Sequence, residues 1–156
     1  MIDSVKQAVK RFASVPAATA LLAGVAGGVA IAPAEADPCP DVQLIFARGT
    51  FEAPGVGSIG QNFADAVQQR AEGKSVNTYA VNYPASLDFA TAADGVADAR
   101  NKVLSTVSAC PDSKVVVGGY SQGAAVAAYL TMDAVPEGYQ LPPTISGPLP
   151  REVADH

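Results

Sequence analysis

Tryptophan is absent from this sequence, and its one histidine is the last of 156 residues. Five tyrosines and five phenylalanines leave little aromatic surface on which nucleic-acid bases can stack. Basic residues are also few, with 10 lysines and arginines against 15 acidic residues and a formal net charge of −5. Because phosphate binding needs clustered basic side chains, this composition argues against nucleic acid as a partner.

A long apolar run is missing as well. The most apolar stretch, residues 17–32, is rich in alanine and glycine and falls short of the roughly 20 residues that span a bilayer. Basic residues precede it, and the sequence AEA at 34–36 follows it, as at a signal-peptidase site. We therefore expect residues 1–36 to be a secretory signal peptide cleaved after Ala36, with a membrane anchor as the alternative. Residues 37–156 are then a secreted, extracellular domain without an integral membrane segment, and we expect it to be a monomer.

Cysteine occurs only twice, at Cys39 and Cys110. An exported protein folds in an oxidising compartment, where a disulfide between these two would close a loop of about 70 residues, worth about 4 kcal/mol in the chain-entropy model. Two free buried thiols are the alternative. Two cysteines and one histidine at these spacings make no recognisable ligand set, so we expect no metal and no other cofactor.

Short apolar runs alternate with helical patterns along residues 37–156. Three runs have the length of strands, namely residues 42–47, 76–81 and 114–119. Apolar residues at three- and four-residue spacing predict helices over residues 58–71, 89–109 and 121–132. The alternation predicts an α/β fold with a central parallel sheet between helices. Five prolines predict a loop over residues 136–150, and a helical pattern begins at residue 151.

The sequence GYSQG places Ser121 between Gly119 and Gly123, directly after the third predicted strand. In a strand-to-helix turn of this kind, the serine hydroxyl projects from the sheet edge as a nucleophile, and the next backbone amide faces the developing oxyanion. The alternative is a serine that only caps a helix. Because active sites in parallel sheets lie beyond the carboxyl ends of the strands, we expect residues 48–50, 82–84 and 120–122 to converge there.

Two motifs carry a resemblance to a known family. The segments IFARGT at 45–50 and CPDSKVVVGGYSQG at 110–123 resemble the cutinases, in particular the secreted bacterial cutinase-like serine esterases. The order of motifs is similar as well, with VNYPA at 81–85 between them, and the resemblance covers residues 37–156. It implies an α/β-hydrolase fold, a three-layer αβα sandwich without a large lid. The implied activity is hydrolysis of carboxylic esters, from cutin-like polyesters to short-chain lipid esters.

The resemblance also implies roles for individual residues. Ser121 is the expected nucleophile, and the amides of Gln122 and Thr50 are the expected oxyanion-hole donors. Cys39 and Cys110 match a structural disulfide of the family. Arg48 is expected to make structural hydrogen bonds behind the oxyanion loop, with a clamp on a substrate carboxylate as the alternative. Acyl-groove lining and core packing both remain open for three aromatic residues, Phe51, Tyr83 and Phe89.

A base and an acid for Ser121 are harder to find. In α/β-hydrolases they follow the serine in the order acid, then histidine. The adjacent Asp155 and His156 point in different directions on a helix and do not face each other. In cutinases, sequence similar to residues 149–156 leads into a further strand that precedes the catalytic Asp and His. We therefore expect the chain to be truncated at its C-terminus, unstable and inactive as written. A non-catalytic surface or binding protein on a hydrolase scaffold is the competing interpretation.

Overall fold

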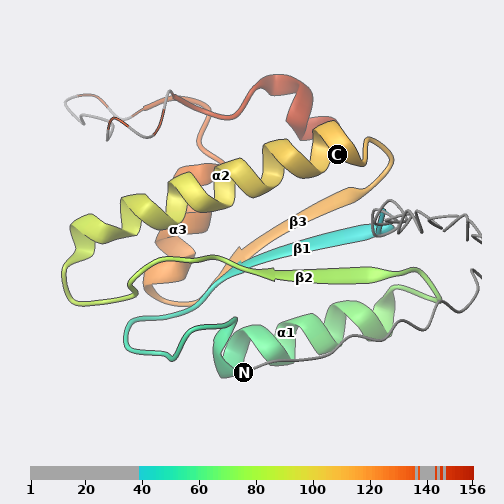
Figure 1. Cartoon of the computed structure of the whole chain (residues 1–156), viewed down its shortest axis with the longest axis horizontal. Helices are drawn as coiled ribbons and strands as arrows, with labels where there is room; N and C mark the ends of the chain where they lie inside the picture. The colour runs from blue at the N-terminus through green and yellow to red at the C-terminus, as the bar shows by residue number, and fades with distance from the viewer. Residues whose placement is uncertain (1–38, 136, 138–142, 144, 146) are drawn as a thin grey trace, which may run out of the picture. The chain divides into compact units, whose positions relative to one another are not determined.

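The computed structural model describes residues 39–135, 137, 143, 145 and 147–156. The expected signal peptide and its cleavage site lie outside the described residues, as does much of the proline-rich loop. Along the chain, strands and helices alternate as predicted (Figure 1), in the order β1 (Val42–Ala47), α1 (Gly57–Arg70), β2 (Val76–Ala80), η1 (Phe89–Thr91), α2 (Ala92–Ala109), β3 (Lys114–Gly119), α3 (Gln122–Leu130) and η2 (Arg151–Asp155).

The three strands form one parallel sheet in the order β2-β1-β3. Val42 of β1 is in register with Val76 of β2 and with Lys114 of β3, so all three strands begin at one end and finish at the other. The central strand is buried at five of its six residues, which explains its continuous apolar sequence. The predicted α/β fold with a parallel sheet is confirmed.

Helices cover both faces of this sheet, α1 on one side and α2 with α3 on the other (Figure 1). On the α1 side, the rings of Phe46 and Phe63 lie 5.7 Å apart between their centroids. On the other side, the main core brings Ile45 of β1 against Val96 of α2 and Val126 of α3. Alternate residues of β1 thus serve opposite layers, as the pleat of a strand requires.

Several boundaries differ from the sequence prediction. The helix predicted from residue 89 begins with the 3-10 turn η1, where the Asp88 side chain accepts a hydrogen bond from the Ala90 amide. The helix after Ser121 ends at Leu130 rather than at residue 132, and the next hydroxyl, that of Thr131, donates to the Ala127 carbonyl. The terminal pattern forms a 3-10 helix, η2, and not an α-helix.

The amino ends of the strands are tied together. A disulfide joins Cys39 to Cys110 with their Cα atoms 5.5 Å apart, which confirms the predicted pairing. Next to it, the Asp41 carboxylate accepts hydrogen bonds from the Ser75 amide (2.7 Å) and the Ser75 hydroxyl (2.9 Å), which bridge the starts of β1 and β2. These bonds from Ser75 hold the pKa of Asp41 below its usual value.

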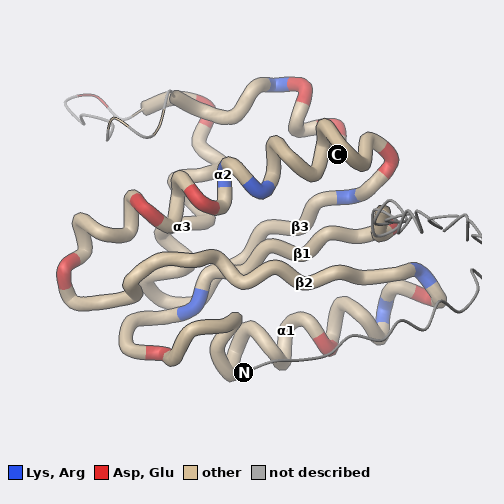
Figure 2. The backbone as a smooth tube through the Cα atoms, in the orientation of Figure 1, with Lys and Arg blue, Asp and Glu red and all other residues tan. Residues whose placement is uncertain are grey.

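Charged side chains show no basic face in the described part of the chain. Figure 2 shows Lys and Arg scattered over several elements, with acidic residues between them. Within the same described ranges, no helix combines the length and the apolar character needed to cross a bilayer.

Candidate active site

Ser121 occupies a strained turn between β3 and α3. Its backbone has φ 53° and ψ −118°, in the positive-φ region that side chains other than glycine's seldom adopt. Such a conformation costs on the order of 1–3 kcal/mol and persists only where the surroundings enforce it. The residue is exposed, and no described group forms a hydrogen bond with its hydroxyl. The turn therefore presents a free hydroxyl at the carboxyl end of the sheet.

The two glycines of the motif are required by close backbone contacts. A Cβ on Gly119 would lie 2.0 Å from the Gly123 carbonyl oxygen. A Cβ on Gly123 would lie 2.0 Å from the carbonyl oxygen of Ala47 and 2.6 Å from that of Arg48. The start of α3 is thus pressed against both β3 and the loop after β1. The spacing of glycines around Ser121 therefore has a steric cause.

Arg48 holds the loops behind this turn. It is 5% exposed, and its guanidinium donates to the carbonyl oxygens of Glu52 (2.9 Å), Val81 (3.4 Å) and Tyr83 (2.5 Å). The Tyr83 hydroxyl in turn donates to the Arg48 carbonyl. With its donors committed to backbone carbonyls, Arg48 has the structural role expected from the sequence and is not placed to clamp a substrate carboxylate.

Glu52 is a supporting residue that the sequence reasoning missed. One oxygen of its carboxylate accepts from the Gly49 amide at 2.6 Å, and the other accepts from the Ser58 amide at 3.1 Å. It thereby ties residues 49–52 to the amino end of α1, where a negative charge is favourable. In the sequence, Glu52 is only an acidic residue three positions after a glycine in a predicted loop. That pattern is too common to assign a role to the residue.

Two amides near Ser121 lack partners. In the loop after β1, Gly49 donates to Glu52, Phe51 to the Ala85 carbonyl (2.8 Å) and Glu52 to the Gly49 carbonyl (3.2 Å). No described group accepts a hydrogen bond from the Thr50 amide between them. The same holds for the amide of Gln122, which opens α3. These two are the residues predicted to line an oxyanion hole.

The Gln122 side chain packs inward. It is 3% exposed, and its Nε2 donates to the Ser86 carbonyl at 3.0 Å, which joins α3 to the loop before η1. Its Oε1 is buried without a partner among the described residues. The contact of this side chain with Ser86 was not predicted from the sequence.

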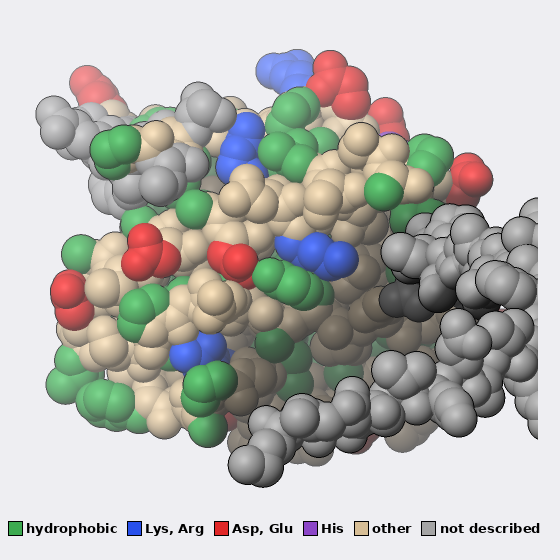
Figure 3. Space-filling model, in the orientation of Figure 1, with side chains coloured by type: hydrophobic (Ala, Val, Ile, Leu, Met, Phe, Trp, Pro, Cys, Tyr) green, Lys and Arg blue, Asp and Glu red, His purple; other side chains and the backbone are tan. Residues whose placement is uncertain are grey.

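Burial separates the three aromatic residues for which both acyl-groove lining and core packing were open. Tyr83 is 4% exposed and belongs to the core, where burial, partly opposed by Arg48, raises the pKa of its hydroxyl. Phe51 and Phe89 are 75% and 60% exposed. Leu87 and Tyr120 are also exposed, and all four residues lie in segments that follow the carboxyl ends of the strands. Figure 3 shows hydrophobic side chains along the left edge of the molecule.

His156 lies far from Ser121. Its carbonyl accepts a hydrogen bond from the Val115 amide (2.9 Å), at the start of β3, whereas Ser121 follows the end of that strand. Val115 and Ser121 are six residues apart along the strand, which at about 3.3 Å each is roughly 20 Å.

Among the described residues, no cluster of three or more potential metal ligands occurs.

The family model described as cutinase matches residues 38–156. The chain belongs to the cutinase family. Among relatives with curated descriptions, this cutinase-family chain is 48% identical over 108 residues to carboxylesterase Culp1 of Mycobacterium bovis, covering 69% of this chain and 48% of that protein. It is 42% identical over 150 residues to phospholipase Culp4 of Mycobacterium tuberculosis, covering 96% of this chain and 63% of the relative. The chain therefore spans less than two thirds of either relative.

Solved structures agree with the assignment of fold. A cutinase from Trichoderma reesei in complex with a phosphonate inhibitor matches with a TM-score of 0.52 and 34% identity, over 60% of this chain and 43% of that chain. An acetyl xylan esterase matches with a TM-score of 0.59 and 26% identity, over 75% of this chain and 59% of that chain. The cutinase-like α/β architecture predicted from the two motifs is confirmed.

Proposed function

We propose that the protein is a secreted serine esterase that hydrolyses carboxylic esters, with Ser121 as its nucleophile. The observation that carries the proposal is the combination of an exposed serine at φ 53° with two unpartnered amides, those of Thr50 and Gln122, in the adjoining backbone. A strained turn of this kind is maintained at a stability cost that a mere helix cap does not require. Relatives described as a carboxylesterase and a phospholipase support an ester substrate.

In the proposed reaction, Ser121 Oγ attacks the ester carbonyl carbon while a base takes the hydroxyl proton. The carbonyl oxygen becomes an oxyanion that accepts hydrogen bonds from the Thr50 and Gln122 amides. The C–O bond to the alcohol then breaks, and the alcohol leaves with the proton. Water attacks the resulting acyl-enzyme, releases the acid and returns the proton to Ser121.

The base and the acid are proposed to come from residues beyond those described. His156 and Asp155 lie at the opposite end of β3 from Ser121, so they do not complete the site in this arrangement. We therefore expect residues 1–156 alone to show negligible esterase turnover. Turnover that is lost on Ser121→Ala in this form would overturn that expectation.

A fluorophosphonate probe tests the nucleophile directly. In a form of the protein extended to the length of its relatives, we expect one adduct on Ser121, located by peptide mass spectrometry. Ser121→Ala removes the adduct, whereas Ser105→Ala, a change on the exposed side of α2, leaves it. No adduct on Ser121 in the extended protein would sink the esterase proposal and favour a non-catalytic protein on the same scaffold.

A further inference from the structure

The segment of residues 81–86, which follows β2, holds the loop that contains Thr50. The buried Arg48 guanidinium donates to two carbonyl oxygens of this segment. The Phe51 amide donates to a third, that of Ala85, at 2.8 Å. Arg48 and Phe51 lie on either side of Thr50 in the chain, so the segment holds the loop before and after this candidate oxyanion donor.

The hydrogen bond between Phe51 and Ala85 joins two residues with an unusual backbone. Phe51 has φ 63° and Ala85 has φ 51°, and neither is a glycine. Ala85 is also buried. Residues other than glycine keep a positive φ only where the surrounding structure enforces it. The geometry next to Thr50 is therefore imposed by the contacts of residues 81–86 and not by local preference.

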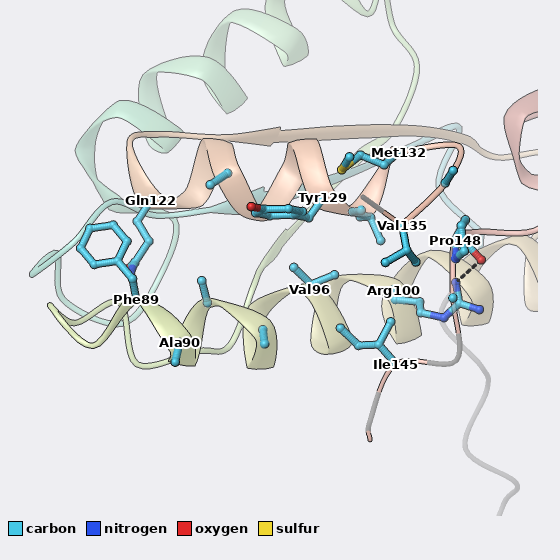
Figure 4. Close-up of a pocket in the computed structure, with 16 residues that line it drawn as sticks. Phe89, Ala90, Val96, Arg100, Gln122, Tyr129, Met132, Val135, Ile145 and Pro148 are labelled. Carbon is cyan, nitrogen blue, oxygen red and sulfur yellow. Dashed lines mark hydrogen bonds between the residues drawn. The ribbon is translucent and has the colours of Figure 1, made fainter. Parts of the chain in front are cut away.

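The far end of the same segment reaches the second candidate donor. The carbonyl of Ser86, directly after Ala85, accepts a hydrogen bond from Gln122 Nε2 at 3.0 Å. The buried Gln122 side chain lies near Phe89 of η1, at one end of an apolar pocket between α2 and α3 (Figure 4). Residues 81–86 thus link the two backbone stretches that carry the proposed oxyanion donors.

Asp98 of α2 anchors the beginning of this segment. Its Oδ2 accepts a hydrogen bond from the Asn82 amide at 2.9 Å. Both of its carboxylate oxygens lie 3.1 Å from the Tyr79 hydroxyl, near the end of β2. These bonds lead to neither Ser121 nor Thr50. An effect of Asp98 on the reaction therefore has to pass through residues 81–86.

We propose that Asp98 is a positioning residue of the candidate active site, which fixes the Thr50 amide through residues 81–86. This inference rests on the proposed esterase function and adds a residue on α2 to its machinery. A carboxylate suits the role because charge-assisted hydrogen bonds are stronger than neutral ones. Since an oxyanion donor acts only from a fixed position, a small shift of the loop lowers the stabilisation of the transition state.

The test compares an ester with its thionoester, para-nitrophenyl butyrate and the thiono counterpart, in the extended protein. Sulfur accepts weaker hydrogen bonds than oxygen, so the ester-to-thionoester ratio of kcat/KM reports on the oxyanion donors and not on the amount of folded enzyme. Asp98→Ala should lower kcat for the ester about tenfold with little change in KM, and should lower the ratio. Asp94→Ala is the matched control, because Asp94 is an exposed acid on the same helix.

Two further variants separate positioning from stability. Asp98→Asn keeps an acceptor oxygen for the Asn82 amide and should restore most of the ratio. Tyr79→Phe removes the other partner of Asp98 but leaves the bond to Asn82, so it should keep the ratio even where it lowers stability. If Asp98→Ala does not fold, as judged by circular dichroism, Asp98→Leu replaces it, since leucine has a similar volume and no acceptor.

An unchanged ratio in Asp98→Ala, or an equal fall in Asp94→Ala or Tyr79→Phe, would overturn the role of Asp98. Fluorophosphonate labelling separates this failure from failure of the esterase proposal. If Ser121 is labelled but the ratio ignores Asp98→Ala, the role of Asp98 is wrong and the esterase stands. If Ser121 stays unlabelled in the extended parent protein, the esterase proposal is wrong, and the role of Asp98 is wrong with it.

Discussion

The Glu52 carboxylate accepts a hydrogen bond from the Gly49 amide at 2.6 Å, directly beside the loop amide proposed as an oxyanion donor. Its second oxygen reaches the Ser58 amide near the start of α1. The Glu52 side chain therefore ties the loop that carries Thr50 to the amino end of α1. Glu52 is a positioning residue in this arrangement.

Replacing Glu52 should weaken the fold and the site together. Glu52→Ala removes two charge-assisted hydrogen bonds, and we expect it to lower the free energy of unfolding by about 2 kcal/mol in urea titrations. Glu52→Gln keeps one acceptor oxygen, so its free energy of unfolding should lie between those of the parent protein and Glu52→Ala. Asp133→Ala, an exposed acid beyond α3, serves as the control. Equal stability of Glu52→Ala and Asp133→Ala would contradict the assignment.

Neighbouring glycines of β3 should respond very differently to alanine. At Gly119 the new Cβ meets a backbone carbonyl oxygen at 2.0 Å, whereas at Gly118 it meets the Phe46 ring at 3.0 Å, which can shift. We expect Gly119→Ala to lose about 3 kcal/mol or more, and Gly118→Ala less than half of that. Chemical denaturation measures both. Similar losses would show that the turn relaxes more easily than its contacts indicate.

The disulfide should account for a large part of the stability. Cys39 and Cys110 are 71 residues apart in the sequence. In the chain-entropy model, breaking a disulfide that closes a loop of that size lowers the free energy of unfolding by about 4 kcal/mol. Cys39→Ser and the double variant with Cys110→Ser should lose similar amounts, because each breaks the same bond. Thermal unfolding with and without reductant provides the measurement, and a parent protein indifferent to reductant would contradict it.

Alkaline pH should destabilise the fold through two tyrosines. Burial raises the pKa of both Tyr79 and Tyr83 above the ordinary 10.0, and the Asp98 carboxylate, which accepts from the Tyr79 hydroxyl, raises the pKa of Tyr79 further. The folded state thus favours the neutral phenols. Their contribution is complete below pH 10 and is lost as pH rises through the raised values.

Unfolding free energies measured between pH 8 and pH 11 test this expectation. The free energy of unfolding of the parent protein should fall above pH 10. In Tyr83→Phe, the fall between pH 8 and pH 11 should be smaller than in the parent protein. Tyr120→Phe, at an exposed position, is the control. The same pH profile for Tyr83→Phe and the parent protein would show that other groups govern alkaline unfolding.

The elements that sequence predicted best are those with a strong local signal. β1 and β3 match to the residue because both are short apolar runs with clear ends. The turn at Ser121 was predictable because Gly119 and Gly123 are steric requirements of one short motif. The disulfide followed from having two cysteines in a domain expected to be exported.

What the sequence did not reveal depends on contacts between distant segments. The bond between Gln122 and Ser86 joins residues 36 apart, and neither residue has a pattern of its own. The apolar pocket that Ala125 lines takes its other lining residues from η1, from α2 and from the segment after α3. The 3-10 geometry of η2 likewise reflects its docking, with the His156 carbonyl bonded to Val115.

The disulfide and Ser121 lie at opposite ends of β3, since Cys110 precedes the strand and the serine follows it. One end of the sheet is therefore held by the disulfide, and the other end carries the candidate nucleophile. Substitutions in the loops at the serine end leave the disulfide and the Asp41–Ser75 bridge untouched, whereas Arg48 and Glu52 still hold residues 48–52 in place. In protein engineering, a substitution at the serine end would therefore be made against a base that the disulfide keeps closed.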